Sequence, residues 1–185
     1  MAMGAIALRF LMLTAARSGE VVGAQWSEFD LARGVWEIPA ARMKAAKEHR
    51  VPLSAPALAI LGELWAHRRA ELVFSAHSSA RKPISDATMR TMLRRVTLPE
   101  DKLTVHGLRS TFRDWAGETT SHPREVIEAA LAHQLKDKAE AAYARGDLYT
   151  ILYTVFCAKI RHYGRLFFRM KTQPKPACIR REAAI

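Results

Sequence analysis

Basic side chains recur at helical spacing in the stretch from His106 to Arg113. On a helical wheel His106, Arg109 and Arg113 lie within about 60° of one another, and apolar residues, including Phe112 and Trp115, lie on the opposite side. A basic face of this kind can bind phosphate, because each guanidinium group presents parallel N–H donors to two oxygens. An ordinary amphipathic helix with a solvated basic face has the same periodicity, and the periodicity alone favours that simpler interpretation.

A further arginine, Arg17, follows an apolar helical segment at the turn where the next helix is expected to begin. The backbone at such a turn would hold its guanidinium group in one place. Two arginines from separate elements can clamp the two non-bridging oxygens of one phosphodiester. An ion pair between Arg17 and Glu20 explains the residue equally well when it is considered alone.

Two more side chains with possible catalytic roles lie towards the end of this region. His133 lies just past an apolar helical segment, and Tyr143 follows ten residues later among alanines. Taken singly, they are more typical of a structural histidine and a core tyrosine. The sequence has no HExxH, GxxxxGK[ST], GxGxxG or GxSxG motif, and no carboxylate pattern for two magnesium ions. We therefore expect no metal and no cofactor.

The elements that must position these residues are mostly helices. We expect them over residues 6–15, 19–25, 86–96, 105–118, 123–132 and 138–144, and one more after Ser54. Ser18, Ser54 and Ser85 are the expected N-caps. Residues 34–39 and 50–53 favour strands and predict a hairpin whose long tip carries Lys44 and Lys47, and a serine-rich loop is expected over residues 77–81. The predicted fold class is mainly α with one small antiparallel sheet or hairpin (α+β).

Composition and charge limit the class of protein. The chain has 185 residues, of which 49% are hydrophobic, and a formal net charge of +11. Such a chain folds as a globular domain, and its excess of positive charge favours a polyanionic partner. The two cysteines, Cys157 and Cys178, form no CxxC motif, which argues against a disulfide scaffold or a cysteine-based zinc site and fits a reducing compartment. No apolar run reaches the length of a membrane span. We expect a cytoplasmic protein with no membrane contact.

Five motifs, taken in order, resemble the catalytic domain of the tyrosine recombinases, in particular the bacteriophage and genomic-island integrase branch. They are Thr14-Ala-Ala-Arg17-Ser-Gly-Glu20-Val, Arg42-Met-Lys44 with His49-Arg-Val-Pro-Leu-Ser54, His106-Gly-Leu-Arg109-Ser-Thr-Phe-Arg-Asp-Trp-Ala, Leu131-Ala-His133 and Glu140-Ala-Ala-Tyr143-Ala-Arg-Gly-Asp147. The order and spacing of the five are far more specific than any single motif. With this resemblance, a catalytic role becomes the favoured interpretation of the His106 helix.

The resemblance implies DNA strand cleavage and rejoining through a 3′-phosphotyrosyl intermediate, with no metal or nucleotide cofactor. By position, Tyr143 matches the nucleophile, and Arg17 and Arg109 match the clamp that stabilises charge on the pentavalent phosphate. Arg113 is an expected DNA-binding residue on the same basic face. Double-stranded DNA is the implied substrate, and other recombinase subunits on the same DNA are the implied partners.

The remaining roles also follow from the resemblance. Lys44 matches the general acid for the departing 5′-hydroxyl, and Lys47 is a nearby competitor for that role and a DNA-binding candidate. His106 matches the acid/base partner of the nucleophile, and His133 matches the imidazole that hydrogen-bonds the phosphate. Glu20 fits a role in orienting the cationic side chains.

The resemblance divides the chain at residue 147. Residues 1–147 are expected to form the catalytic domain, and residues 148–185, which carry eight basic residues and one acidic residue, an atypical basic C-terminal tail. The family's integrases carry DNA-binding domains ahead of the catalytic one. One alternative is therefore a truncated DNA-binding remnant without strand exchange. Another is an enzyme like the type IB topoisomerases, which relaxes supercoils by the same chemistry.

Overall fold

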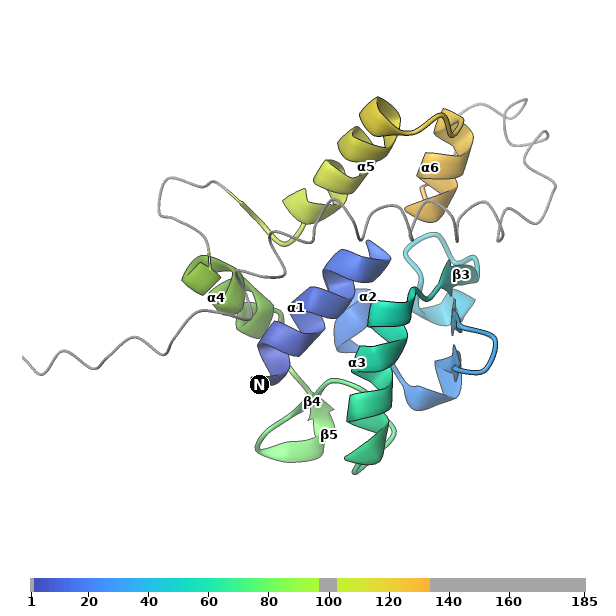
Figure 1. Cartoon of the computed structure of the whole chain (residues 1–185). Coiled ribbons are helices and arrows are strands. Elements are labelled where there is room, and N and C mark those ends of the chain that lie inside the picture. The colour runs from blue at the N-terminus through green and yellow to red at the C-terminus, as the bar shows by residue number, and fades with distance from the viewer. Residues whose placement is uncertain (1, 97–102, 134–185) are drawn as a thin grey trace, which may run out of the picture.

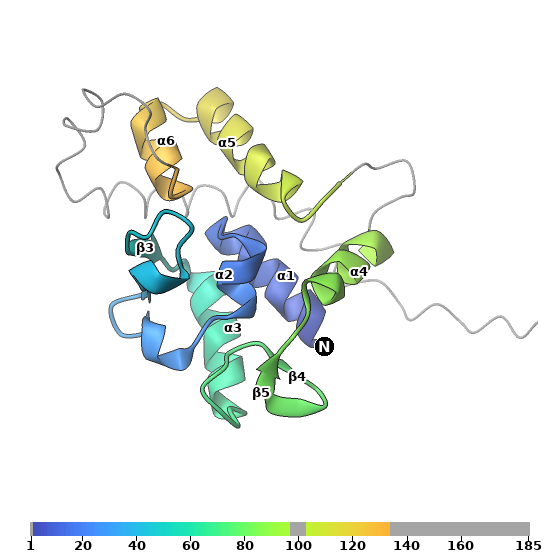
Figure 2. The same cartoon turned by 180° about the vertical axis from the view of Figure 1, so that it is seen from behind.

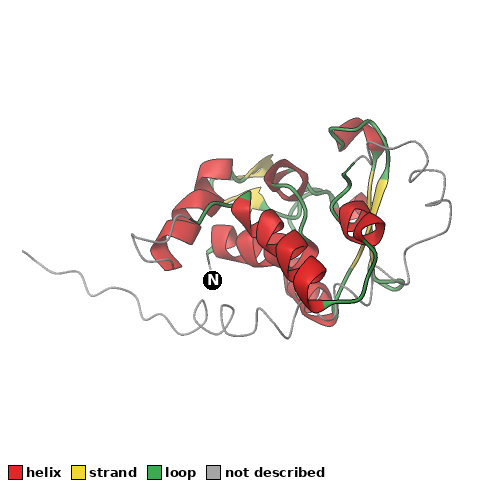
Figure 3. Cartoon of the chain, turned by 90° about the horizontal axis from the view of Figure 1, so that it is seen from above, coloured by secondary structure: helices red, strands yellow, loops and turns green. Residues whose placement is uncertain are grey.

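The computed structural model describes residues 2–96 and 103–133 (Figure 1). Helices dominate this part of the chain (Figure 3). The α-helices are α1 (Met3–Thr14), α2 (Ser18–Val22), α3 (Ala55–Ala66), α4 (Asp86–Val96), α5 (Gly107–Thr119) and α6 (Arg124–Ala130), and two 3₁₀ turns are η1 (Trp26–Glu28) and η2 (Ala40–Arg42). The strands are β1 (Phe29–Asp30), β2 (Val35–Ile38), β3 (His49–Pro52), β4 (Ser75–Ala76) and β5 (Ser79–Pro83). The predicted fold class, mainly α with small antiparallel β-structure, is confirmed.

Helix α1 is the centre of the core. It packs against α2, α3 and α4, and it lies between α3 and α4 in Figures 1 and 2. Its residue Phe10 is fully buried, with its ring centroid 5.5 Å from that of Trp36 and 5.4 Å from that of Phe74. Such aromatic contacts stabilise the core by more than the burial of their apolar surface alone would. The buried length of α1 fixes the position of its C-terminal end, where the functional residues begin.

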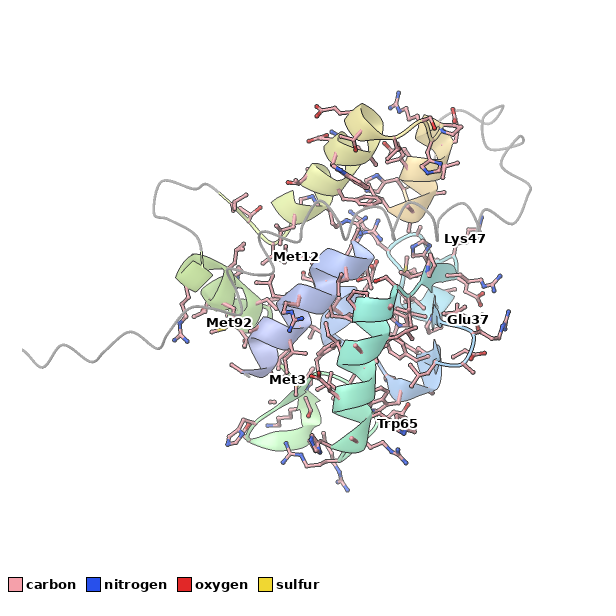
Figure 4. The ribbon with its side chains drawn as sticks, in the orientation of Figure 1. Met3, Met12, Glu37, Lys47, Trp65 and Met92 are labelled. Carbon is pink, nitrogen blue, oxygen red and sulfur yellow. The ribbon has the colours of Figure 1, made fainter. Side chains whose placement is uncertain are left out.

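The predicted hairpin is present and forms part of a three-stranded antiparallel sheet in the order β1-β2-β3. In its register Val35 pairs with Pro52 and Ile38 pairs with His49. Gly34, with φ of 67°, makes the turn before β2, a left-handed conformation that glycine adopts without strain. The segment between β2 and β3 carries both predicted lysines, and Lys47 lies on it just before β3 (Figure 4).

The expected serine-rich loop over residues 77–81 is correct only for residues 77–78, which form a turn, because residues 79–81 belong to β5. Strand β5 pairs with β4 in a second, two-stranded antiparallel sheet. These strands are short and half-buried to exposed, so they carry no apolar alternation from which a hairpin could have been predicted.

The predicted helices that fall within the described residues are confirmed, with changes at their ends. Arg17, rather than Ser18, is the N-cap residue of α2, and Pro123 precedes α6 instead of opening it. Ser54 stands at the N-cap of α3, but its side chain makes no capping hydrogen bond. The expected helix over residues 138–144, together with Tyr143, lies outside the described residues. None of the described helices is long and apolar enough to cross a membrane.

Helices α5 and α6 pack against each other and lie on one side of the molecule, above α1 and α2 in Figure 1 and in the reverse view of Figure 2. Leu108, Phe112 and Trp115 of α5 are buried, as the apolar periodicity predicted. Arg109 is buried with them, at 5% exposure, instead of standing on a solvated face. A buried arginine requires partners for its charge and its donors, and these partners define the candidate site.

Candidate active site

A cavity of about 310 Å³ opens where α2, the start of α5 and the loop after η2 come together. Its lining is Arg17, Ser18, Gly19, Glu20, Arg42, Lys44, Val105, His106 and Arg109. Four of the residues to which the sequence analysis assigned catalytic roles, and the predicted orienting residue Glu20, are therefore among its walls. They come from segments separated by up to 92 positions in the sequence.

Arg17 is held by the turn between α1 and α2. Helix α1 ends at Thr14; the next residue, Ala15, has a left-handed φ of 50° that turns the chain, and Arg17 is the N-cap residue of α2. Glu20 is buried, and its carboxylate accepts hydrogen bonds from the Arg17 backbone N–H at 2.7 Å and from Nη1 at 2.6 Å. The expected ion pair is therefore present, and it directs the guanidinium group into the cavity lining.

Arg109 reaches the same place from α5. Its Nη1 donates to the carbonyl oxygen of Ala15, and its Nη2 donates to that of Leu131 at 2.5 Å. Burial lowers the pKa of Arg109 to about 10, with a smaller lowering from the charge of Arg17, while Glu20 acts in the opposite direction. The group is still protonated at neutral pH, so two positive charges stand side by side at the cavity.

The two arginines also meet at the end of α6. Arg17 Nη2 lies 3.5 Å from the carbonyl oxygen of Leu131 and donates to that of Ala132 at 3.2 Å. Ala132 is left-handed, with φ of 48°, and this conformation brings the next residue, His133, beside Arg109. The distance from His133 Nε2 to Arg109 Nη2 is 3.4 Å. Cations at the C-terminal end of a helix satisfy its last carbonyl groups and interact favourably with its dipole.

His133 has a second partner. Its Nδ1 lies 2.5 Å from a carboxylate oxygen of Glu128, one turn earlier on α6. A carboxylate at Nδ1 places a proton on that nitrogen and fixes the plane of the ring. The other nitrogen, Nε2, is then directed towards the arginines.

The other predicted residues differ in their proximity to the cavity. His106 is the exposed N-cap residue of α5, and Lys44 is exposed in the loop after η2; both line the cavity. Lys47, also exposed, is not in the lining. Arg113 is exposed on α5 and pairs with its neighbour Asp114 at 3.2 Å. The structure therefore brings Arg17, Arg109, Lys44, His106 and His133 together and leaves Lys47 and Arg113 outside the cavity.

His49 is a site residue that the sequence did not predict. Its pKa falls from 6.5 to about 4, chiefly because burial disfavours the charged ring; Glu20 and a hydrogen bond to the Ala130 backbone act in the opposite direction, and the charges of Arg109 and Arg17 add to the lowering. The ring therefore lies within the electrostatic field of both arginines and is neutral at pH 7. The signal in the sequence was its position directly before the predicted strand, at the base of the lysine-bearing loop.

Arg42 was also missed, although it stands two residues before Lys44 and lines the cavity. Its Nη1 donates to both carboxylate oxygens of the buried Glu28. Its Nη2 donates to the backbone carbonyl oxygen of Glu20 at 2.5 Å. Only the tertiary contacts identify these partners, because Arg42 is 14 residues from Glu28 and 22 from Glu20.

The arrangement fits an anionic ligand. Arg17 and Arg109 supply planar cationic donors from two elements, and His133, His106 and Lys44 supply groups that can exchange a proton around them. In residues 2–96 and 103–133 no group of three or more His, Cys, Asp or Glu side chains is placed to hold a metal ion.

The sequence matches the phage integrase family over residues 2–147, and the chain belongs to that family. It is 39% identical over 137 residues to the prophage integrase IntA of Escherichia coli K12, with 74% of this chain and 33% of that protein covered. It is 33% identical over 152 residues to the integrase of Enterobacteria phage P4, with 75% of this chain and 35% of that protein covered. The chain thus spans about a third of the length of these curated relatives.

The fold is shared with solved recombinase structures. The XerA recombinase matches with a TM-score of 0.59 and 17% sequence identity, covering 94% of this chain and 59% of that one. The Tn1549 transposon integrase, in complex with a circular intermediate DNA, matches with a TM-score of 0.53 and 16% identity, covering 76% of this chain and 58% of that one. At these identities the likeness shows the fold.

Proposed function

We propose that this chain is the catalytic part of a site-specific recombinase, which cleaves and rejoins double-stranded DNA through a 3′-phosphotyrosyl intermediate. The observation that carries the proposal is the convergence of Arg17 and Arg109 on one cavity with Lys44 and His106. Family membership and the DNA complex of the Tn1549 integrase support the substrate class. Residues 1–147 form the proposed catalytic domain, and residues 148–185 the proposed basic tail.

The proposed nucleophile is Tyr143. Its phenolic oxygen attacks the phosphorus of a DNA phosphodiester, the bond from phosphorus to the 5′ oxygen breaks, and the tyrosine keeps the 3′ phosphate. A 5′-hydroxyl from another strand then attacks the phosphotyrosine and releases the tyrosine. The phosphoester bond is conserved throughout, so the reaction needs no external energy source.

Arg17 and Arg109 are the proposed phosphate clamp. The transition state carries extra negative charge on the non-bridging oxygens, and preorganised cationic donors stabilise that charge more than they stabilise the ground state. Glu20 preorganises Arg17 through its two short hydrogen bonds. Because Arg109 retains its proton at neutral pH, the clamp is charged under working conditions.

The remaining groups move protons. Lys44 donates a proton to the departing 5′ oxygen, which otherwise leaves as an unfavourable alkoxide. His106 accepts the proton of the tyrosine hydroxyl, and His133 donates a hydrogen bond to the phosphate through Nε2 when both of its ring nitrogens carry a proton. Lys47 is the competing acid, and Arg113 is proposed to contact DNA outside the cavity. The proposed location of the protein is the cytoplasm, and its proposed partners are other recombinase subunits bound to the same DNA.

A trapping experiment tests this function without knowledge of the target site. The chain is incubated with duplexes whose sequence is randomised around a nick placed a few nucleotides from the scissile position, so that the short cleaved fragment diffuses away. Covalent adducts are isolated on a denaturing gel, and their DNA is sequenced. We expect adducts with a common sequence from the wild type and none from Tyr143→Phe.

The variants Tyr149→Phe and Tyr153→Phe are the matched controls, because they remove other hydroxyl groups from the same region. We expect both to form adduct. Adduct formation by Tyr143→Phe and its loss in Tyr149→Phe would contradict the assignment. Relaxation of supercoiled plasmid without any recombinant product would favour a topoisomerase, and DNA binding without adduct would favour a binding remnant.

A further inference from the structure

Just before Lys44, the loop is attached to the body of the protein by the buried side chain of Met43 and by the hydrogen bonds of Arg42. The loop follows η2, and Arg42 is the last residue of that turn. Lys44 itself has no hydrogen bond or ion pair with any described residue and is exposed. The position of its ammonium group therefore depends on the backbone that carries it.

One end of the attachment is in the hydrophobic core. Arg42 Nη1 bonds both carboxylate oxygens of Glu28, and Trp36 Nε1 donates to the same carboxylate at 2.9 Å. The indole of Trp36 is fully buried and stacks on Phe29 at a centroid distance of 5.2 Å. Glu28 is therefore a rigid anchor, held by the core on one side and by Arg42 on the other.

The other end of the attachment is on α2. Arg42 Nη2 donates to the carbonyl oxygen of Glu20, the residue whose carboxylate holds Arg17. A Cβ atom at Gly23 would lie 3.0 Å from this Nη2, so glycine leaves the room that the guanidinium group occupies. Arg42 thus connects the base of the lysine loop with the element that orients the phosphate clamp.

We infer that Arg42 is a positioning residue, which holds the loop so that Lys44 reaches the 5′ oxygen of the phosphodiester bound by Arg17. The inference rests on the proposed function, in which Lys44 is the general acid. Arg42 lines the cavity, but its Nη1 donates to Glu28 and its Nη2 donates to the Glu20 carbonyl group. Its contribution to cleavage therefore passes through Lys44.

The test uses Arg42→Lys, because a lysine keeps the charge that the buried Glu28 requires but cannot bond Glu28 and the Glu20 carbonyl group together as the planar fork does. The control is Arg50→Lys, the same exchange on β3, where Arg50 pairs with Glu37 at 3.3 Å. Cleavage rates are measured on a trapped sequence with the ordinary 5′ oxygen and with sulfur in its place. A thiolate leaves without a proton, so the sulfur substrate bypasses the acid.

We expect Arg42→Lys to slow cleavage of ordinary DNA by about tenfold or more, a part of the roughly 10²- to 10⁴-fold that general acid–base catalysis contributes. We expect the sulfur substrate to be cleaved by this variant at nearly the wild-type rate. Arg42→Lys combined with Lys44→Ala should be no slower than Lys44→Ala alone. Equal slowing on both substrates, or additive defects in the double variant, would overturn the inference, and Arg50→Lys should behave as wild type on both.

A second measurement does not depend on catalysis. Amide hydrogen exchange of the DNA-free protein should become faster over residues 43–48 in Arg42→Lys, with exchange in α1 unchanged and no acceleration in Arg50→Lys. Unchanged exchange over residues 43–48 would overturn the positioning role whether or not the protein cleaves DNA. Absence of wild-type adduct would instead contradict the proposed function, so the two failures are distinguishable.

Discussion

The partly buried His49 at the site makes the stability of the protein dependent on pH in a way that can be measured. His49 is surrounded by Glu20 and Arg17 near α2, by Arg109 of α5 and by the Ala130 backbone of α6. Its pKa falls from 6.5 to about 4, chiefly because burial disfavours the charged ring. Replacing it by glutamine removes the titrating ring and keeps an N–H donor for the Ala130 carbonyl group.

The sign and size of this pH effect on the unfolding free energy follow from the thermodynamic linkage between protonation and folding. Above pH 6.5 His49 is neutral in both the folded and the unfolded chain, and its contribution to stability is fully present. As the pH falls from 6.5 to 4, the unfolded chain binds a proton that the folded chain does not, so stability is lost through this window. The difference between a pKa of 6.5 in the unfolded chain and about 4 in the folded chain corresponds to a loss of about 3 kcal/mol of unfolding free energy once the pH has fallen to 4.

The assay is urea unfolding of the wild type and of His49→Gln at intervals from pH 7.5 to pH 4. The other titrating groups are common to both proteins, so their effects cancel in the comparison of the two pH profiles. We expect the wild type to lose about 3 kcal/mol more than the variant by pH 4. Parallel profiles would refute the reasoning, because they would show that the ring is protonated in the folded protein as readily as in the unfolded one.

Three further results are expected. Arg17→Ala should slow adduct formation on the order of a hundredfold or more, and Arg17→Lys should restore little of that rate, because an ammonium group lacks the planar fork; a fast lysine variant in single-turnover cleavage would contradict the clamp. Ala132→Gly should raise the unfolding free energy by up to about 1 kcal/mol in urea titrations, because the half-buried Ala132 has a left-handed φ of 48°, which glycine adopts without strain. Ala15→Gly relieves the same strain at φ of 50° but also removes a buried methyl group, so its unfolding free energy should be nearly unchanged. Deleting residues 161–185 should weaken DNA binding for all sequences and flatten the dependence of log affinity on log salt concentration; an unchanged slope would show that the tail's charge makes no phosphate contacts.

Most of the helical framework could be predicted from the sequence, because apolar periodicity and local start signals define helices without knowledge of tertiary contacts. Helix α4 has the predicted bounds, and α1 ends within one residue of its predicted end. The N-cap residue of α2 is Arg17 and not the predicted Ser18, because the Glu20 carboxylate accepts a hydrogen bond from the Arg17 backbone N–H. The hairpin of β4 and β5 was missed because pairing of short polar strands leaves no periodic signal.

Some residues of the candidate site could likewise be predicted from the sequence, and others could not. Arg17, Arg109 and His133 could be found because their types and order match a family motif. The roles of His49 and Arg42 could not, because each depends on partners brought together by the fold and neither lies at a spacing that indicates a contact. The burial of Arg109 was missed for a related reason: its helical position predicts a basic face, while the carbonyl groups that accept its donors come from the ends of other helices.

The central claim is that this chain forms a covalent bond between a tyrosine and the 3′ phosphate of DNA. Mass spectrometry of protease-digested adduct tests it most directly, because it identifies both the modified residue and the end of the DNA. The account predicts a single peptide that carries a nucleotide 3′ phosphate on Tyr143. A phosphate on Tyr149 or on a serine, attachment through the 5′ end, or no adduct on any sequence would contradict it.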